Sequence, residues 1–197
     1  MPNSQETFVR VYDNSVPKSY CDQLIAEFQA CPHVYAGMLQ ESDPHDDDFK
    51  VCDEIHVRAI YHLERNNPAE LSKWKRIDKQ LFTYLKGNLS AFIGEFPALS
   101  GQILKNEGFR FKRYPKGTGK FGEHIDMTPT TPTRVFSIIL YLNDVREGGE
   151  TEFPFQGVRV QPKAGRMMIS PPFWTHPHRG LVPISNDKFI VNNFLTL

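Results

Sequence analysis

The sequence predicts an α+β protein that is mainly β, with the two facing sheets of a double-stranded β-helix, or jelly roll. Two observations lead to this prediction. Residues 107–197 contain eight short β-prone runs separated by Gly, Pro and Asn, whereas residues 1–106 carry longer stretches of helical periodicity. We therefore expect one domain over residues 1–197, with helical support over about 1–106 and the jelly-roll core over about 107–197.

Composition narrows the class of protein. With 197 residues, of which 40% are hydrophobic, the chain can bury a full core. Lys plus Arg and Asp plus Glu each total 23, so the formal net charge is zero, which argues against a nucleic acid or a membrane surface as the partner. The cysteines, which form no CxxC pair, are Cys21, Cys31 and Cys52. Neither a signal peptide nor a run of about 18 apolar residues is evident, so we expect a soluble, cytoplasmic protein.

The amino-terminal part is expected to contain four elements. In order, they are a β-prone run over 8–12, a helix over 17–31, a strand over 55–63 and a helix from Leu71 to about Phe96. Apolar residues at helical spacing support both helices. The strand rests on the alternation of Ile55, Val57 and Ala59 with polar neighbours. The long helix is amphipathic and should therefore cover a sheet.

Two groups of polar residues in this part have structural explanations. We interpret His56 and His62 as surface or core histidines, because a histidine outside a complete ligand set is more often structural or exposed than a metal ligand. The segment 41–50, ESDPHDDDFK, places five acidic residues around His45, which suits either a calcium or second metal site or a solvated loop. The loop is favoured because the Gly-bearing spacing of an EF-hand is missing.

Eight runs in the carboxy-terminal part are predicted strands. They span 108–114, 121–126, 133–143, 151–155, 158–162, 166–170, 175–182 and 187–197. EGGE at 147–150 and PKAG at 162–165 are predicted turns, because Gly and Pro favour the conformations that end a strand. In such a barrel, a metal or ligand site lies near an open mouth and takes side chains from separate strands.

A possible metal site begins with His124 and Asp126. On a strand, side chains two residues apart point the same way, so this imidazole and carboxylate face one point in space. Alone, the pair also fits an exposed His beside a solvated Asp. The 2-His-1-carboxylate triad of non-haem Fe(II) oxygenases needs a second His and leaves positions open. Both His176 and His178, in PPFWTHPHRG, could supply it.

An iron site of this type needs a cosubstrate that fills two open positions and supplies two electrons, which a 2-oxo acid does. 2-Oxoglutarate also carries a distal carboxylate, so its pocket needs a buried cation on the strand after the second His. Lys188 lies ten residues beyond His178, one predicted hairpin further on. Taken singly, Lys188 also fits an ordinary surface lysine of a hairpin.

Four motifs in this order give the chain a family resemblance: HID, YLNDVREGGETEF, VQPKAGRMM and HRGLVPISNDK. From about residue 109 to the carboxy terminus, the chain resembles the Fe(II)/2-oxoglutarate-dependent oxygenases, and among them the prolyl 4-hydroxylase-like group. The resemblance implies that the metal ligands are His124, Asp126 and His178. The spacing to Lys188 and the Arg-Gly that follows favour His178 over His176 as the distal ligand.

The resemblance also implies the residues of the cosubstrate pocket. Lys188 would bind the distal carboxylate of 2-oxoglutarate, and Tyr114 and Tyr141 match tyrosines that line this pocket in the family. For Tyr141, the role of a core aromatic residue is equally open. The resemblance therefore implies a single Fe(II)/2-oxoglutarate dioxygenase domain over residues 1–197.

The implied activity is hydroxylation of an unactivated C–H bond. Fe(II) is the metal, 2-oxoglutarate and O2 are cosubstrates, and ascorbate is a reductant that such enzymes use. The leading expectation for the substrate is a prolyl residue in a peptide or protein; the alternative is a free amino acid or another small molecule. A nucleic-acid demethylase is disfavoured because FIVNNFLTL lacks a second Arg after Lys188, and a cupin-like barrel without turnover is disfavoured by the complete triad. The sequence leaves the oligomeric state open.

Overall fold

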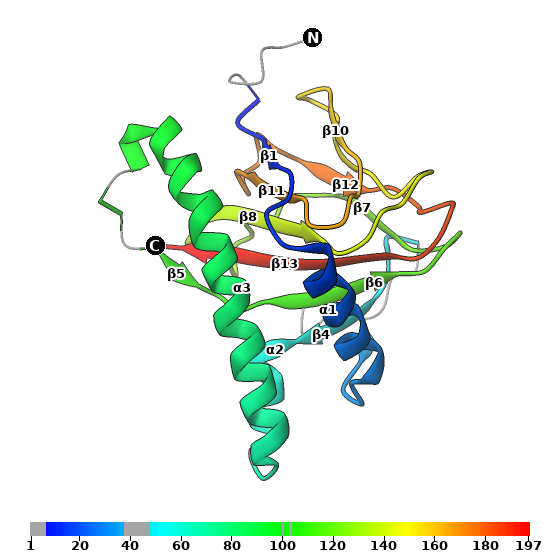
Figure 1. Ribbon diagram of the computed structural model, residues 1–197. Helices are drawn as coiled ribbons and strands as arrows, with labels where there is room; N and C mark the ends of the chain where they lie inside the picture. The colour runs from blue at the N-terminus through cyan, green and yellow to red at the C-terminus, as the bar shows by residue number, and fades with distance from the viewer. Residues whose placement is uncertain (1–6, 38–47, 100, 103) are drawn as a thin grey trace.

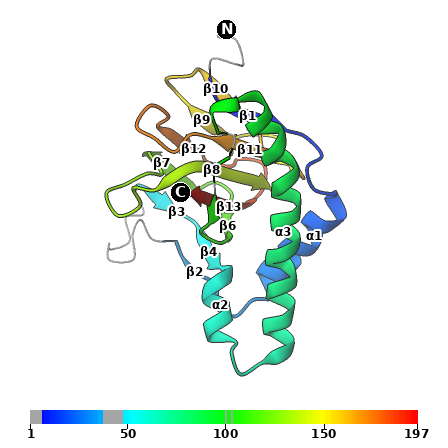
Figure 2. The same ribbon diagram turned by 90° about the vertical axis from the view of Figure 1, so that its left-hand side faces the viewer.

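The computed structural model describes residues 7–37, 48–99, 101–102 and 104–197. Two antiparallel sheets face each other, and helices cover the outer face of the larger sheet (Figures 1 and 2). This arrangement confirms the predicted α+β jelly roll. All eight predicted carboxy-terminal strands are present, although each is shorter than the β-prone run that predicted it.

The larger sheet has β13 near its centre and takes strands from both parts of the chain. Its order is β1 (Arg10–Tyr12), β11 (Met167–Ser170), β8 (Arg134–Tyr141), β13 (Lys188–Thr196), β6 (Arg110–Tyr114), β4 (Asp53–His56) and β2 (Tyr35–Ala36), with β5 (Lys105–Asn106) also paired to β13. The amino-terminal part therefore adds strands at both edges of this sheet as well as helical support.

The smaller sheet carries the metal-ligand motifs. Its order is β10 (Val158–Val160), β9 (Thr151–Phe153), β12 (His178–Gly180), β7 (Lys120–His124) and β3 (Lys50–Val51). Strands β7 and β12, which are far apart in the sequence, are neighbours here. This pairing brings the HID motif next to the HRG motif.

Three helices and one short 3-10 turn complete the fold. They are α1 (Lys18–Ala30), α2 (Val57–Leu63), α3 (Pro68–Glu95) and η1 (Pro97–Leu99). The side chain of Asn67 caps α3 by accepting from the backbone N–H of Glu70 at 3.4 Å, and Pro68 occupies the first turn, where no N–H is needed. Helix α3 confirms the predicted long helix.

The buried face of α3 packs against the larger sheet. Its members are Trp74, Ile77, Leu81, Leu85 and Phe92. The Trp74 ring meets Phe111 of β6 edge-on at 5.9 Å, and the Phe92 ring meets Phe136 of β8 at 5.2 Å. Figures 1 and 2 both show the helix lying across this sheet on the side away from β7 and β12. The space between the two sheets is therefore left for a site.

The side chains of strand β8 alternate between the face of the sheet covered by the helices and the face toward the space between the sheets. Phe136, Ile138 and Leu140 belong to the core beneath the helices, whereas Ser137 and Ile139 line a pocket between the sheets. The alternation follows from the two-residue period of a strand. Because both faces of the sheet are covered at β8, the sequence of this strand is a nearly continuous apolar run.

The predicted strand over 55–63 is wrong beyond His56. Strand β4 ends there and helix α2 begins at Val57. The reason is the extent of its partner: β6 begins at Arg110, opposite His56, so no further ladder is available. From Val57 onward, the apolar residues Val57 and Ile60 are buried at helical spacing.

The acidic segment 41–50 falls mostly within residues 38–47, which lie outside the described residues. Its interpretation as a loop therefore stays a prediction. The three cysteines are free thiols. Among the helices of the described residues, none is long and apolar enough to cross a membrane.

Candidate metal centre and cosubstrate pocket

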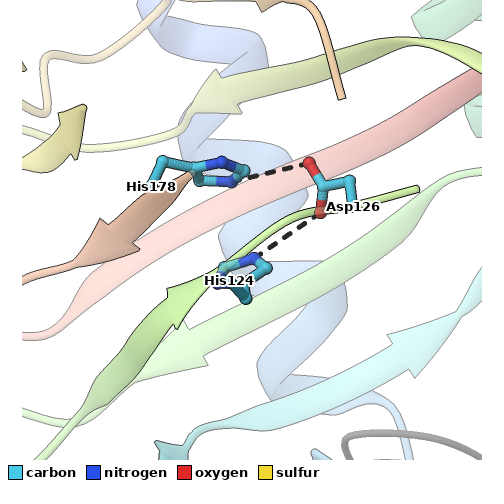
Figure 3. A group of neighbouring side chains, drawn as sticks. All are labelled: His124, Asp126 and His178. Carbon is cyan, nitrogen blue, oxygen red and sulfur yellow. Dashed lines mark ion pairs between the residues drawn. The ribbon is translucent and has the colours of Figure 1, made fainter. Parts of the chain in front are cut away.

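Strands β7 and β12 place two histidines side by side. His124 and His178 are paired across the ladder, and Asp126 follows β7 two residues after His124. Each imidazole Nε2 lies 3.5 Å from a different carboxylate oxygen of Asp126, as Figure 3 shows. One ligand atom from each residue lies within 4.8 Å of the other two. The group therefore has the residue types and the spacing of a 2-His-1-carboxylate site.

The hydrogen bonds of the two histidines leave their Nε2 atoms available. The Nδ1 of His124 lies 2.8 Å from the carbonyl oxygen of Gly122, and the Nδ1 of His178 lies 3.2 Å from that of His176. A carbonyl can only accept, so each Nδ1 carries the hydrogen and each Nε2 keeps a lone pair. Burial, only partly opposed by Asp126, lowers the pKa of His178 to about 4, which keeps the ring neutral as a metal ligand must be.

Asp126 supplies the negative charge of the group. Burial would raise its pKa, but His178, His124 and Ser137 hold the pKa well below its usual range, so the carboxylate is ionised. Its side chain is 10% exposed, and Oδ2 has no hydrogen-bond partner among the described residues. An ionised, largely buried carboxylate between two Nε2 lone pairs fits a divalent cation, whose charge would satisfy it.

The main chain of Asp126 is held from two sides. Its N–H donates to the carbonyl of Pro172 at 3.2 Å, and its carbonyl accepts from Nη1 of Arg134 at 2.7 Å. Arg134 is itself fixed by two hydrogen bonds to Glu107, at 2.8 and 2.7 Å. We missed this positioning role of Arg134 in the sequence, because a bond to a carbonyl eight residues away leaves no side-chain pattern.

A pocket between the sheets adjoins the three candidate ligands. Its lining consists of Lys112, Tyr114, Phe121, His124, Asp126, Ser137, Ile139, Thr151, His178, Gly180, Lys188, Ile190 and Asn192. Both sheets contribute, with the candidate metal ligands coming from the smaller sheet and the two lysines from the larger. The structure thus brings His124, Asp126, His178, Lys188 and Tyr114 into one cavity.

Lys188 is the first residue of β13 and points into this pocket. Its Nζ donates to the carbonyl of Gly149 at 2.8 Å and lies 4.7 Å from the centre of the Tyr114 ring. Burial lowers the pKa of Lys188 to about 8. The predicted hairpin between His178 and Lys188 is wrong, because β12 and β13 belong to different sheets and the intervening residues cross between them.

The EGGE turn provides the hydrogen-bond acceptor for Lys188. Gly148 and Gly149 both have positive φ angles, 69° and 73°, which glycine adopts without strain. A Cβ atom on Gly148 would lie 2.2 Å from the carbonyl oxygen of Val182, so no larger residue fits there without movement. The turn predicted from the sequence is therefore present, and it also sets the position of the Gly149 carbonyl.

The two tyrosines lie at different distances from the cavity. Tyr114 lines it and is paired with Lys188 across the β6–β13 ladder. Tyr141 is fully buried and does not line it; its hydroxyl donates to Oγ1 of Thr151 at 2.7 Å, and Thr151 does line it. Tyr141 therefore reaches the pocket only through Thr151, a residue that we did not single out in the sequence.

His176 stands apart from the candidate metal centre. Its Nε2 lies 3.0 Å from the carbonyl oxygen of Thr7 and its Nδ1 lies 2.9 Å from Oγ1 of Thr175, so both ring nitrogens are engaged. The group that could hold a metal contains His178 instead. His176 precedes β12, so it does not share a strand face with His178.

The comparison with known proteins identifies the same part of the chain that carries the candidate site. Residues 109–196 match the protein-family model of the 2OG-Fe(II) oxygenase superfamily. The matched segment runs from just before β6 to the end of β13 and contains every candidate ligand described above. This segment belongs to the 2OG-Fe(II) oxygenase superfamily.

Relatives of this oxygenase include proteins named as prolyl hydroxylases. Probable prolyl 4-hydroxylase 9 of Arabidopsis thaliana is 35% identical over an 80-residue alignment that covers 30% of this chain and 27% of that protein. The chain thus spans about a quarter of the length of that relative.

Solved structures of prolyl hydroxylases have a similar fold. The viral collagen prolyl hydroxylase of Paramecium bursaria Chlorella virus-1, solved with 2OG, superposes with a TM-score of 0.61 at 17% identity and 95% coverage of both chains. A Trichoplax adhaerens prolyl hydroxylase, solved with a hypoxia inducible factor peptide fragment, has a TM-score of 0.71 at 13% identity, covering 96% of this chain and 84% of its own. At these identities the likeness is one of fold.

Proposed function

We propose that this oxygenase uses Fe(II), 2-oxoglutarate and O2 to hydroxylate an unactivated C–H bond, with a prolyl residue in a peptide or protein as its substrate. The observation that carries the proposal is the convergence of two Nε2 lone pairs and one ionised carboxylate beside a cavity that also contains a buried lysine. A divalent metal and a dicarboxylic 2-oxo acid are the ligands that suit such a pair of sites.

Each residue has a defined part in this proposal. His124, Asp126 and His178 hold the iron on one side, and Lys188 pairs with the distal carboxylate of 2-oxoglutarate. Tyr114 shapes the wall beside that carboxylate. When bound, the iron and 2-oxoglutarate together supply the oxidising chemistry, and the protein contributes ligand geometry, a largely dry cavity and placement of the substrate.

The substrate class rests on the relatives. Prolyl hydroxylases recur among the similar sequences and structures, including one solved with a peptide fragment bound. Hydroxylation of a free amino acid or another small molecule is the alternative outcome, because the cavity itself carries no feature that singles out a peptide.

A succinate-release assay tests the proposal. The purified protein, with Fe(II), 2-oxoglutarate and ascorbate, is offered proline-containing peptides, free proline and other amino acids, and the product is located by mass spectrometry. We expect succinate release with a peptide and a mass gain of one oxygen on proline. Turnover with free amino acids alone would reassign the substrate, and no turnover with either class would refute the proposal.

Two histidine variants provide the matched control. His178→Ala removes a metal ligand and should abolish turnover and weaken metal binding at least about tenfold. His176→Ala removes a buried histidine of the same loop that contacts Thr7 instead of the centre, so it should still bind metal. The opposite pattern would show that the distal ligand is His176.

A further inference from the structure

The pocket contains a second lysine that the proposed function leaves without a role. Lys112 lies on β6 two residues before Tyr114, so both side chains point to the same face of the sheet. Like Lys188, Lys112 lines the cavity beside the candidate metal centre. Only 8% of Lys112 is exposed. A buried lysine is tolerated only where its charge is compensated, so the groups around Lys112 indicate what it does there.

Lys112 is fixed in the wall by Glu54. The two residues are directly opposite each other on β6 and β4, and Nζ of Lys112 lies 2.9 Å from Oε1 of Glu54. Lys50 contacts the same oxygen at 3.0 Å. Burial would raise the pKa of Glu54, but Lys112 and Lys50 bring it to about 2, so the carboxylate stays ionised. Lys112 is thus a charged group of fixed position.

The ammonium groups of Lys112 and Lys188 lie near the same aromatic side chain, Phe121. Nζ of Lys112 is 5.6 Å from the centre of the Phe121 ring. A Cβ atom built on Gly180 would lie 3.7 Å from Nζ of Lys188 and 3.7 Å from Cβ of Phe121. Because Lys188 pairs with Tyr114 and Ile190 pairs with Lys112 in the ladder, Lys112 is the diagonal neighbour of Lys188 across β6 and β13, within reach of a long side chain.

Two cations in one small cavity repel each other, and an anion between them would relieve this repulsion. We infer that Lys112 is a second cationic contact of the cosubstrate pocket, acting together with Lys188 on the distal carboxylate of a 2-oxo dicarboxylic acid. This inference rests on the proposed function. Its consequence is selectivity: the difference in affinity between 2-oxoglutarate and a 2-oxo acid without a distal carboxylate should be larger than Lys188 alone would give.

The test measures binding of two probes to the Mn(II)-loaded protein by calorimetry. 2-Oxoglutarate carries the distal carboxylate and 2-oxopentanoate lacks it. Lys112→Met keeps an unbranched side chain that is shorter by one atom and removes the charge. We expect it to weaken binding of 2-oxoglutarate at least tenfold and to change binding of 2-oxopentanoate by less than twofold. A purely structural role for Lys112 would weaken both probes alike.

Lys50→Met is the matched control, because Lys50 contacts the same oxygen of Glu54 but does not line the pocket. We expect it to leave binding of both probes within twofold of wild type. The double variant Glu54→Gln with Lys112→Met, which removes both charges of the pair, is measured in parallel. It should show the same selective loss as Lys112→Met.

Besides an equal loss for both probes in Lys112→Met, two results would overturn the inference. One is wild-type affinity for 2-oxoglutarate in either variant that carries Lys112→Met. The other is an equal loss in Lys50→Met, which would mean that Lys112 acts only through the packing of this wall. In both cases the wild-type protein binds 2-oxoglutarate and the proposed function stands. A wild-type protein that binds no 2-oxoglutarate would instead refute the proposed function.

Discussion

Replacing Lys188 by methionine should stabilise the ligand-free fold and at the same time weaken cosubstrate binding. Burial lowers the pKa of this lysine from 10.5 to about 8. At 1.36 kcal/mol per tenfold change, the ammonium is disfavoured in the folded protein by roughly 3 kcal/mol. Because the unfolded chain binds this proton more tightly, the destabilisation is complete below pH 8 and is relieved as the pH rises toward 10.5.

Two contributions oppose each other in this variant. Methionine removes the buried charge but also the hydrogen bond to Gly149, which contributes about 1 kcal/mol. A net gain of about 1–2 kcal/mol at pH 7 is therefore expected. For cosubstrate binding, Lys188→Met has only an unfavourable effect, because a distal carboxylate left unpaired in a buried site costs about 3–5 kcal/mol. The affinity for 2-oxoglutarate should therefore fall at least about 100-fold.

Two measurements check this prediction. Urea unfolding without 2-oxoglutarate, at pH 7 and pH 10, gives the stability, and calorimetry with Mn(II)-loaded protein gives the affinity. Lys188→Arg, which keeps the charge, should retain part of the affinity. Lys116→Met, at an exposed lysine, should change neither quantity. A Lys188→Met variant that unfolds more easily than wild type, or that binds 2-oxoglutarate equally well, would refute the reasoning.

Three further outcomes are expected. Arg134→Met should lower Zn(II) affinity about tenfold, because the carbonyl of Asp126 loses its donor; unchanged affinity in a competition assay would remove Arg134 from the centre. Trp74→Ala should reduce the free energy of urea unfolding by about 3–5 kcal/mol, whereas Leu63→Ala, at a side chain 60% exposed, should change it by less than about 0.5 kcal/mol; similar losses would contradict the assigned core. Burial and the two lysine partners of Glu54 together leave its pKa at about 2 instead of 4.5, so the stability that it contributes is complete above pH 4.5 and is lost as the pH falls toward 2. Glu54→Gln should flatten the pH dependence of stability between pH 2 and 5, and an unchanged slope would show that the pair is not charged.

The features predicted correctly from the sequence are those that depend on neighbours along the chain. The period of two residues in 133–143, the helical spacing before Phe96 and the glycines of EGGE are all local signals, and each element is present. His124 and Asp126 are also local, because a strand alone directs both side chains to one side.

The features that were missed or wrong depend on which strands become neighbours. The strand over 55–63 ended early because β6 begins opposite His56, and nothing in the local alternation carries that information. The HxD motif and the presence of two later histidines left the distal ligand open, and only the spacing to Lys188 and the family motif favoured His178, because the two histidines differ mainly in what lies beside them, namely Thr7 for His176 and His124 for His178. Which strands pair with each other is a non-local property, so spacing in the sequence does not determine it.

The residues that the two sheets present to the cavity differ in charge, and this explains why one cavity suits both a cation and an anion. The smaller sheet and the turn after β7 present the Nε2 atoms of two imidazoles and the ionised Asp126, which together attract a metal. The larger sheet presents Lys112 and Lys188, which attract a carboxylate. A bound metal and a dianion that spans the gap would neutralise both sides at once. Each ligand should therefore increase the affinity for the other, and the free energy of unfolding should rise more with both than the separate effects predict.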